Sequence, residues 1–166
     1  VALDVNTGKL AWHFQYTPDD SWDFDEVGVH MLYDTTLNGE KRKVVGHYAR
    51  NGFYYALDRT NGSFIDATTY VEKLNWTAGI DPKTGKPVEY DPGKDLQDYA
   101  QGSVRRGAGE IETCPHIQGG INFWPTAIDP TLERQSTPPP PSAASVTKPK
   151  YYFEHWNPRA VPVAGK

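Results

Sequence analysis

The sequence has 166 residues, which is enough for one domain with a substantial core but too few for two comfortable ones. Its 17 Lys and Arg residues stand against 21 Asp and Glu residues, a formal net charge of −4. This acidic balance argues against a nucleic-acid-binding protein, which usually presents a basic face. No apolar run approaches the roughly 20 residues that a membrane-spanning helix needs, so no membrane span is predicted.

Aromatic residues make up 13% of the chain, beside 15 Gly and 14 Pro. Such a composition favours short strands joined by many turns over long helices. The chain starts at Val1 without a charged-then-apolar leader. We therefore expect either that a signal has been removed or that the sequence is a fragment of something longer.

Residues 1–17 are predicted to form a strand, a turn and a second strand. Residues 4–8 read Asp-Val-Asn-Thr-Gly, in which Asp and Asn side chains can bond their own backbone and Gly tolerates a positive φ. In the segment that follows, every second residue is apolar or aromatic, which is the period of a half-buried strand: Leu10, Trp12, Phe14 and Tyr16.

This unit recurs along the chain. Residues 54–64 repeat the Ala-Leu-Asp core followed by Thr and Gly, residues 79–88 contain Ile-Asp-Pro-Lys-Thr-Gly-Lys, and residues 127–130 carry a weaker trace, Ala-Ile-Asp-Pro. Repeated strand–turn–strand units rich in aromatic residues favour a β-propeller, whose blades stack on their neighbours. The predicted fold class is all-β, a partial propeller of two to three blades.

Two further strands are predicted between the first two units, at residues 27–33 and 43–48, with the hairpin signal Asn38-Gly39 between them. Residues 69–120 are polar and Gly-rich, and we expect a long irregular loop region there. Residues 94–101 are the one place in it where a short helix is predicted.

The end of the chain differs in composition. It contains a run of four prolines at residues 138–141 and shows no periodicity beyond it. We therefore divide the chain into a partial propeller, residues 1–130, and a Pro-rich, poorly ordered or divergent tail, residues 131–166.

The densest group of charges is the segment 17–26, here called the acidic turn. It holds five carboxylates in eight positions: Asp19, Asp20, Asp23, Asp25 and Glu26. One interpretation is a solvated acidic loop. The other is a site on a turn between strands: in an extended chain Asp23 and Asp25 face one way and the aromatic residues between them face the core. Two such carboxylates suit a hard cation, or one of them can act as a base.

Two other segments carry side chains suited to ligand binding. Arg50 precedes an Asn-Gly turn, where it is either an exposed turn residue or a planar donor for an anionic or quinoid oxygen. In the segment 114–125, Gly119-Gly120 permits close approach of another backbone or a ligand, Asn122 offers a donor and an acceptor, and Phe123 with its neighbour offers flat walls to a planar ligand. The alternative there is a turn packed beneath aromatic residues.

These segments together resemble the pyrroloquinoline quinone (PQQ)-dependent alcohol dehydrogenases, quinoproteins of the methanol and ethanol dehydrogenase type. The first repeat resembles the tryptophan-docking motif of that family. The acidic turn resembles its catalytic segment, the stretch 47–59 resembles the strand with its quinone-contacting arginine, and the segment from Cys114 to Asn122 resembles its cofactor-proximal loop. The segments follow in the family's order over about residues 1–130.

The resemblance implies a role for each matching residue. Asp23 would be the general base that takes the alcohol proton, and Asp23 with Asp25 would be metal ligands. Arg50, Asn122 and Phe123 would contact the quinone. Asp25 matches the extra carboxylate of lanthanide-dependent members, whereas calcium-dependent members usually have a small or neutral residue there.

The resemblance also implies the reaction and its setting. It predicts oxidation of primary alcohols to aldehydes by base-assisted hydride transfer to PQQ, with a lanthanide or calcium ion as Lewis acid, in an eight-bladed propeller several times longer than this chain. A small alcohol, a cytochrome c-type electron acceptor and a periplasmic location follow as expectations.

Cys114, read from the sequence either as a buried free thiol or as half of a disulfide, would be disulfide-bonded to a partner outside this sequence. Two alternatives stay open: a non-catalytic propeller scaffold for protein binding, and a sugar-oxidising quinoprotein.

Overall fold

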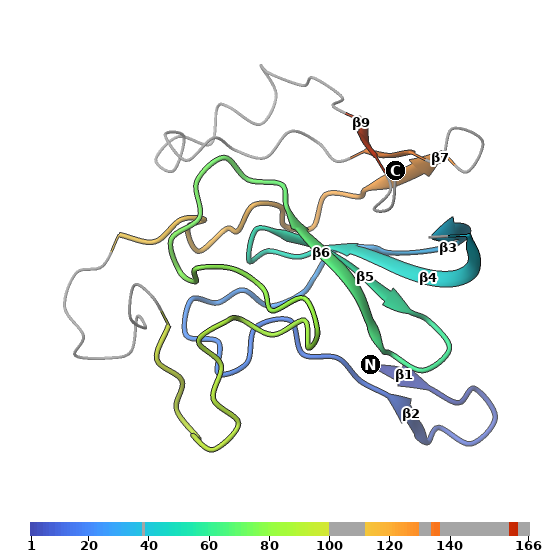
Figure 1. The fold of residues 1–166 in the computed structure, drawn as a ribbon, viewed down its shortest axis with the longest axis horizontal. Coiled ribbons are helices and arrows are strands. Elements are labelled where there is room, and N and C mark those ends of the chain that lie inside the picture. The colour runs from blue at the N-terminus through green and yellow to red at the C-terminus, as the bar shows by residue number, and fades with distance from the viewer. Residues whose placement is uncertain (38, 100–111, 130–133, 137–159, 163–166) are drawn as a thin grey trace.

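The computed structural model of this chain describes residues 1–37, 39–99, 112–129, 134–136 and 160–162. All regular structure in these residues is β-strand, arranged in three antiparallel sheets (Figure 1). None of the described residues forms a helix long and apolar enough to cross a membrane.

The first sheet is a small hairpin of β1 (Ala2–Leu3) and β2 (Leu10–Trp12). The predicted strand through Tyr16 is shorter than expected, but the predicted alternation continues past its end: Phe14 and Tyr16 turn inward, whereas His13 and Gln15 are exposed. Leu10 is exposed, so the inward set begins at Trp12.

The central sheet has four strands that pair in sequence order. They are β3 (His30–Leu37), β4 (Glu40–Tyr48), β5 (Phe53–Asp58) and β6 (Phe64–Thr69). Both strands predicted between the first two repeats are present, although β3 begins three residues later than expected. Its pairing with β4 runs from His30 opposite His47 to Leu37 opposite Glu40, a register that leaves positions 38 and 39 for the turn. Gly39 has a φ of 82°, as the hairpin signal requires; Asn38 lies outside the described residues.

The repeated turns have one hydrogen-bonding pattern. At each, an Asp carboxylate accepts hydrogen bonds from the backbone N–H and the hydroxyl of a following Thr: Asp4 with Thr7, Asp58 with Thr60, and Asp81 with Thr84. A Gly with positive φ follows each Asp by four residues, at positions 8, 62 and 85. Three of the four repeats predicted from the sequence are therefore repeats of structure; the weaker trace at residues 127–130 runs into residues outside the described ones.

The tryptophan of the first repeat docks on the second repeat. Trp12 Nε1 donates to the Arg59 carbonyl over 3.2 Å, and the indole covers Gly62 so closely that a Cβ there would lie 2.5 Å from a ring carbon. This contact fixes the small hairpin to the end of the central sheet (Figure 1).

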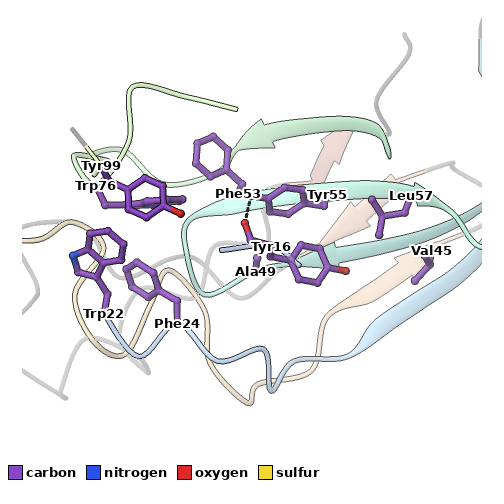
Figure 2. Packing of buried hydrophobic residues seen from close by; sticks show 10 residues of the cluster. All are labelled: Tyr16, Trp22, Phe24, Val45, Ala49, Phe53, Tyr55, Leu57, Trp76 and Tyr99. Carbon is purple, nitrogen blue, oxygen red and sulfur yellow. Dashed lines mark hydrogen bonds between the residues drawn. The ribbon is translucent and has the colours of Figure 1, made fainter. Parts of the chain in front are cut away.

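An aromatic core lies between the central sheet and the loops that cross it. Its rings come from the acidic turn, from β5 and from residues far along the chain, and Figure 2 shows them together. The buried members are Tyr16, Trp22, Phe24, Val45, Ala49, Phe53, Tyr55, Leu57, Trp76 and Tyr99. This core is the support from which the acidic turn projects.

The described part of the predicted loop region 69–120 is irregular after β6 ends at Thr69, apart from one isolated bridge between Ile80 and Pro87, and the irregular chain continues to residue 126. Residues 94–99 form no helix, and the rest of the predicted 94–101 helix lies outside the described residues.

A third sheet joins β7 (Ala127–Asp129), β8 (Arg134–Ser136) and β9 (Ala160–Pro162). The last two strands fall in the segment for which the sequence predicted no regular structure. The remaining residues of the segment 131–166 lie outside the described ones, so the division of the chain at residue 130 stays a prediction.

Candidate active site

Asp20 holds the acidic turn in shape. Its carboxylate accepts backbone hydrogen bonds from Trp22 at 2.8 Å and from Phe24 at 2.6 Å. Between these two donors Asp23 takes a φ of 63°, a left-handed conformation that Asp tolerates better than most residues. The expectation of an extended chain is therefore wrong here: a capped turn carries the two candidate ligands.

The predicted alternation of burial holds nevertheless. Trp22 and Phe24 are buried, with ring centroids 5.9 Å apart and planes 17° apart, and they pack into the aromatic core (Figure 2). Asp23 and Asp25 are exposed. The two rings thus anchor the turn from below and leave both carboxylates accessible.

Arg50 comes to the same place from the end of β4, and it is buried rather than an exposed turn residue. Nη1 donates to the Asp25 carbonyl at 3.3 Å, and Nη2 donates to the carbonyl of Ile117. Nη2 also lies 3.9 Å from Oδ2 of Asp23, whose side chain is 59% exposed. Arg50 Nε is buried and has no hydrogen-bond partner among the described residues. The guanidinium is thereby fixed next to Asp23, and one of its nitrogens, Nε, is left without a partner.

The loop of residues 112–126 closes over Arg50. Gly120 N–H donates to the Arg50 carbonyl at 2.9 Å, and Gly119 approaches so closely that a Cβ there would lie 2.7 Å from Arg50 Cβ. The prediction that these glycines permit close approach of another backbone is confirmed. Three segments widely separated in sequence meet at Arg50.

Asn122 and Phe123 belong to this loop, but their own described contacts point elsewhere. Asn122 Nδ2 donates to the carbonyl oxygen of Gln118 at 3.2 Å. Phe123 is 67% exposed and stacks on Trp124 with centroids 4.6 Å apart. The structure therefore gathers Asp23, Asp25 and Arg50 by direct contact, and brings Asn122 and Phe123 near them only through the loop backbone.

Sequence reasoning missed a buried pair behind Arg50. His47 Nε2 lies 2.7 Å from Glu26 Oε2, and the same oxygen accepts the Arg50 backbone N–H at 3.2 Å. Burial raises the pKa of the Glu26 carboxyl, opposed by its hydrogen bonds with His47 and Arg50. The available signal was His47 itself, since a histidine within a buried strand needs a polar partner. Its partner, 21 residues away, could not be read from the pattern.

A cleft of about 400 Å³ borders the acidic turn. Acidic side chains form one part of its wall and His30 another; Asp19, Asp20, Asp25 and Glu26 supply the acids. Burial raises the pKa of Asp20, and the nearby charges of Asp25 and Asp23 add to that effect, whereas the backbone hydrogen bonds from Trp22 and Phe24 oppose it.

Carboxylate oxygens are the donors that a hard cation prefers. No group of three or more His, Cys, Asp or Glu that could hold a metal occurs among the described residues. Asp23 and Asp25 fit such an ion in donor type but are an incomplete set, so further ligands would have to come from elsewhere. The unpaired buried Nε of Arg50 fits an acceptor oxygen of a ligand.

Cys114 lies at the start of the same loop and is a buried free thiol in this structure. It is the only cysteine of the sequence. The expected disulfide therefore stays a prediction that needs a cysteine outside this sequence.

Residues 1–73 match the family model described as PQQ, glucose/ethanol/alcohol dehydrogenase, beta-propeller domain. The chain is 49% identical over 92 residues to the dehydrogenase subunit of a quinone alcohol dehydrogenase from Komagataeibacter europaeus, covering 55% of this chain and 12% of the relative. It is 38% identical over 130 residues to a quinohemoprotein alcohol dehydrogenase from Comamonas testosteroni, covering 78% and 16%. The chain thus spans a small part of the length of these relatives.

Solved structures give the same result. A europium-containing methanol dehydrogenase matches with a TM-score of 0.71 at 32% identity, over 82% of this chain and 22% of that one. The Comamonas testosteroni enzyme matches with a TM-score of 0.69 at 36% identity, over 82% and 18%. The predicted fold class, an all-β partial propeller, and the predicted resemblance to quinoprotein alcohol dehydrogenases are both confirmed.

Proposed function

We propose that this chain, which resembles the quinoprotein alcohol dehydrogenases, supplies part of the active site of a PQQ-dependent alcohol dehydrogenase. One observation carries the proposal: the buried guanidinium of Arg50 lies 3.9 Å from the exposed carboxylate of Asp23 and keeps an unpaired donor, Nε. The similarity of the chain to alcohol dehydrogenases supports the substrate class.

In this proposal Asp23 is the general base. Its carboxylate is accessible to a small alcohol, and general base catalysis of this kind accelerates a reaction roughly 10²–10⁴-fold. Arg50 presents fixed planar donors to an anionic or quinoid oxygen. Bound PQQ would supply the two-electron chemistry that turns a primary alcohol into an aldehyde, and a bound cation would supply Lewis acidity. Asn122 and Phe123 are proposed to contact the cofactor from the loop above.

Asp23 and Asp25 are the proposed metal ligands of this chain. Both are accessible oxygen donors on one capped turn. A second carboxylate favours a trivalent lanthanide over calcium, because the interaction energy with an anionic oxygen grows with the charge of the ion. The europium named in a matching methanol dehydrogenase structure supports this choice.

A cytochrome c-type electron acceptor and a periplasmic location complete the proposal; the quinohemoprotein among the relatives supports the former. The scaffold alternative predicts no clustering of Asp23, Asp25, Arg50 and Asn122. The contacts of Arg50 with Asp23 and with the Asp25 carbonyl speak against it, whereas Asn122 bonds Gln118 instead. The family model includes glucose dehydrogenases, so sugar oxidation remains the second candidate.

The test is dye-linked oxidation of ethanol and of glucose by the complete gene product that carries this sequence, loaded with PQQ and either lanthanum or calcium. We expect ethanol turnover, lowered by at least about 100-fold in Asp23→Asn. Glu40→Gln is the matched control, since Glu40 is an exposed carboxylate at the opposite end of β4. Turnover of glucose alone would favour the second candidate, and ethanol turnover unchanged in Asp23→Asn would refute the assigned base.

The metal assignment has a test that does not need activity. Terbium emission sensitised by tryptophan, with Trp22 next to Asp23, can be titrated on the complete gene product that carries this sequence and supplies the further ligands. We expect emission that weakens in Asp25→Asn but not in Glu40→Gln. Equal emission from wild type and Asp25→Asn would remove Asp25 from the ligand set.

A further inference from the structure

Glu26 and His47 form a buried pair that the roles assigned above do not use. His47 is 1% exposed at its side chain and Glu26 17%, with Nε2 and Oε2 2.7 Å apart. Glu26 closes the acidic turn and His47 lies in β4, so the pair ties the candidate site to the central sheet.

The hydrogen-bond partner of His47 Nδ1, the ring nitrogen that faces away from Glu26, shows where the protons of the pair lie. His47 Nδ1 lies 3.2 Å from the carbonyl oxygen of Val29, which can only accept, so Nδ1 carries a proton. The 2.7 Å contact on the other side then holds a single shared proton between the imidazole and the carboxyl group. Such a short hydrogen bond between ionisable groups is stronger than a neutral one.

The same Glu26 oxygen holds Arg50. Oε2 accepts the Arg50 backbone N–H at 3.2 Å, while the carbonyl of the preceding residue, Asp25, accepts from the Arg50 guanidinium at 3.3 Å. Two adjacent residues of the acidic turn therefore hold Arg50 at both of its ends. The chain just after the acidic turn also packs tightly on His47, since a Cβ on Gly28 would lie 3.3 Å from His47 Cε1.

We infer that Glu26 is a positioning residue of the candidate site: by binding His47 and the Arg50 backbone with one oxygen, it sets the place of the Arg50 guanidinium relative to Asp23. The effect of Glu26 on catalysis rests on the proposed function, whereas its effect on the position of Arg50 does not. Misplacing a catalytic group by about 1 Å costs on the order of 100-fold in rate.

The chain offers a matched control in Glu89. This carboxylate is also half-buried, and it likewise accepts a backbone N–H, from Ala78 at 2.8 Å, and a side-chain donor, the Thr77 hydroxyl at 2.6 Å. Glu26→Ala and Glu89→Ala thus remove the same kind of interactions, but only the first removes contacts to Arg50. His47→Gln is the conservative variant, because a Gln amide can still donate to Glu26.

The first measurement needs no activity. In the ¹⁵N-labelled chain, we expect hydrogen exchange of the Arg50 backbone amide to accelerate about tenfold or more in Glu26→Ala, because this amide loses its charge-assisted hydrogen bond to the carboxylate. We also expect the Arg50 side-chain Nε–H signal to shift. Neither should change in Glu89→Ala, and His47→Gln should lie closer to wild type than Glu26→Ala. An Arg50 amide and side chain that are unchanged in Glu26→Ala would overturn the inference.

The second measurement uses the complete gene product with PQQ and metal. We expect Glu26→Ala to lower kcat about 10–100-fold with KM within about threefold, Glu89→Ala to leave both near wild type, and His47→Gln to retain most of kcat. Equal losses of kcat in Glu26→Ala and Glu89→Ala would reduce Glu26 to a structural role and overturn the inference. If the wild-type protein did not oxidise alcohols, only the proposed function would be contradicted, because the exchange measurement would still decide whether Glu26 positions Arg50.

Discussion

Gly119 and Arg50 touch through their backbones. A Cβ at position 119 would lie 2.7 Å from both the Cβ and the carbonyl oxygen of Arg50, and Gly119 has a φ of 77°. The loop that carries Asn122 can therefore reach the candidate site only because residue 119 has no side chain.

Gly119→Ala should destabilise the chain by about 2–4 kcal/mol, because the positive φ and the backbone collision both resist an alanine. Gly39→Ala is the control, since Gly39 also has a positive φ but nothing within 4 Å of its Cβ position. We expect a loss of about 1 kcal/mol in the control. Urea unfolding followed by tryptophan fluorescence measures both. Similar losses would mean that the loop moves aside without cost.

Gly62→Ala should disrupt the docking of Trp12. The added Cβ would lie 2.5 Å from the indole, so the ring must leave its place on the second repeat. Gly8→Ala, at the equivalent position of the first repeat, faces open space and is the matched control. We expect Gly62→Ala to cost about 2 kcal/mol more than Gly8→Ala and to shift the Trp12 emission to longer wavelength. Equal stability of the two variants would show that the docking contributes nothing.

Asp20→Ala should loosen the acidic turn. Both carboxylate oxygens accept backbone N–H groups, from Trp22 and Phe24, and their loss leaves two donors without acceptors. We expect a cost of about 2 kcal/mol and faster amide exchange at residues 22 and 24. Asp20→Asn keeps one acceptor and should lie between wild type and alanine. Asp20→Asn as unstable as Asp20→Ala would contradict this account.

Protonation of His30 should weaken the fold in mild acid. Its ring stacks 3.8 Å from that of His47, and burial, with the neighbouring charge of His47, lowers the pKa of His30 to about 4 from its ordinary 6.5. The unfolded chain therefore takes up this proton first, so stability is fully present above about pH 6.5 and falls as pH drops towards 4.

Because solvent still reaches part of the His30 side chain, we expect a loss of about 1–2 kcal/mol rather than the full equivalent of the shift. Urea midpoints at pH 7 and pH 4.5 measure it. His30→Gln should flatten the difference, whereas His13→Gln, at an exposed position, should not. A difference that persists in His30→Gln would assign the acid sensitivity to other groups.

The features that the sequence predicted well are local in the chain. The repeated turns were predictable because Asp4 and Thr7, or Asp81 and Thr84, complete each other's hydrogen bonds within a few residues. The start of β3 was misplaced because its extent depends on the register with β4: pairing begins at His30, and the apolar Val27 and Val29 before it remain exposed.

The candidate site was predictable only in part for the same reason. Asp23 and Arg50 were recognised by their resemblance to a family, and the contact between them is present. The turn at Asp23 and the pair of Glu26 with His47 were not predicted, since each depends on contacts that composition and periodicity do not record. Strands β8 and β9 of the third sheet lie in a proline-rich segment whose pattern gives no strand signal.

The Asp–Thr–Gly turns have a consequence for the history of the chain. Each turn satisfies its main polar groups with residues from the same short stretch, so a duplicated stretch would bring its whole set of hydrogen bonds into any new location. What docks one copy on another is an aromatic ring over the glycine, as Trp12 provides at Gly62 and Phe64 at Gly85, whereas Gly8 of the first repeat faces open space. A fold of this kind can lengthen by whole units, each docked through one ring rather than through a new core.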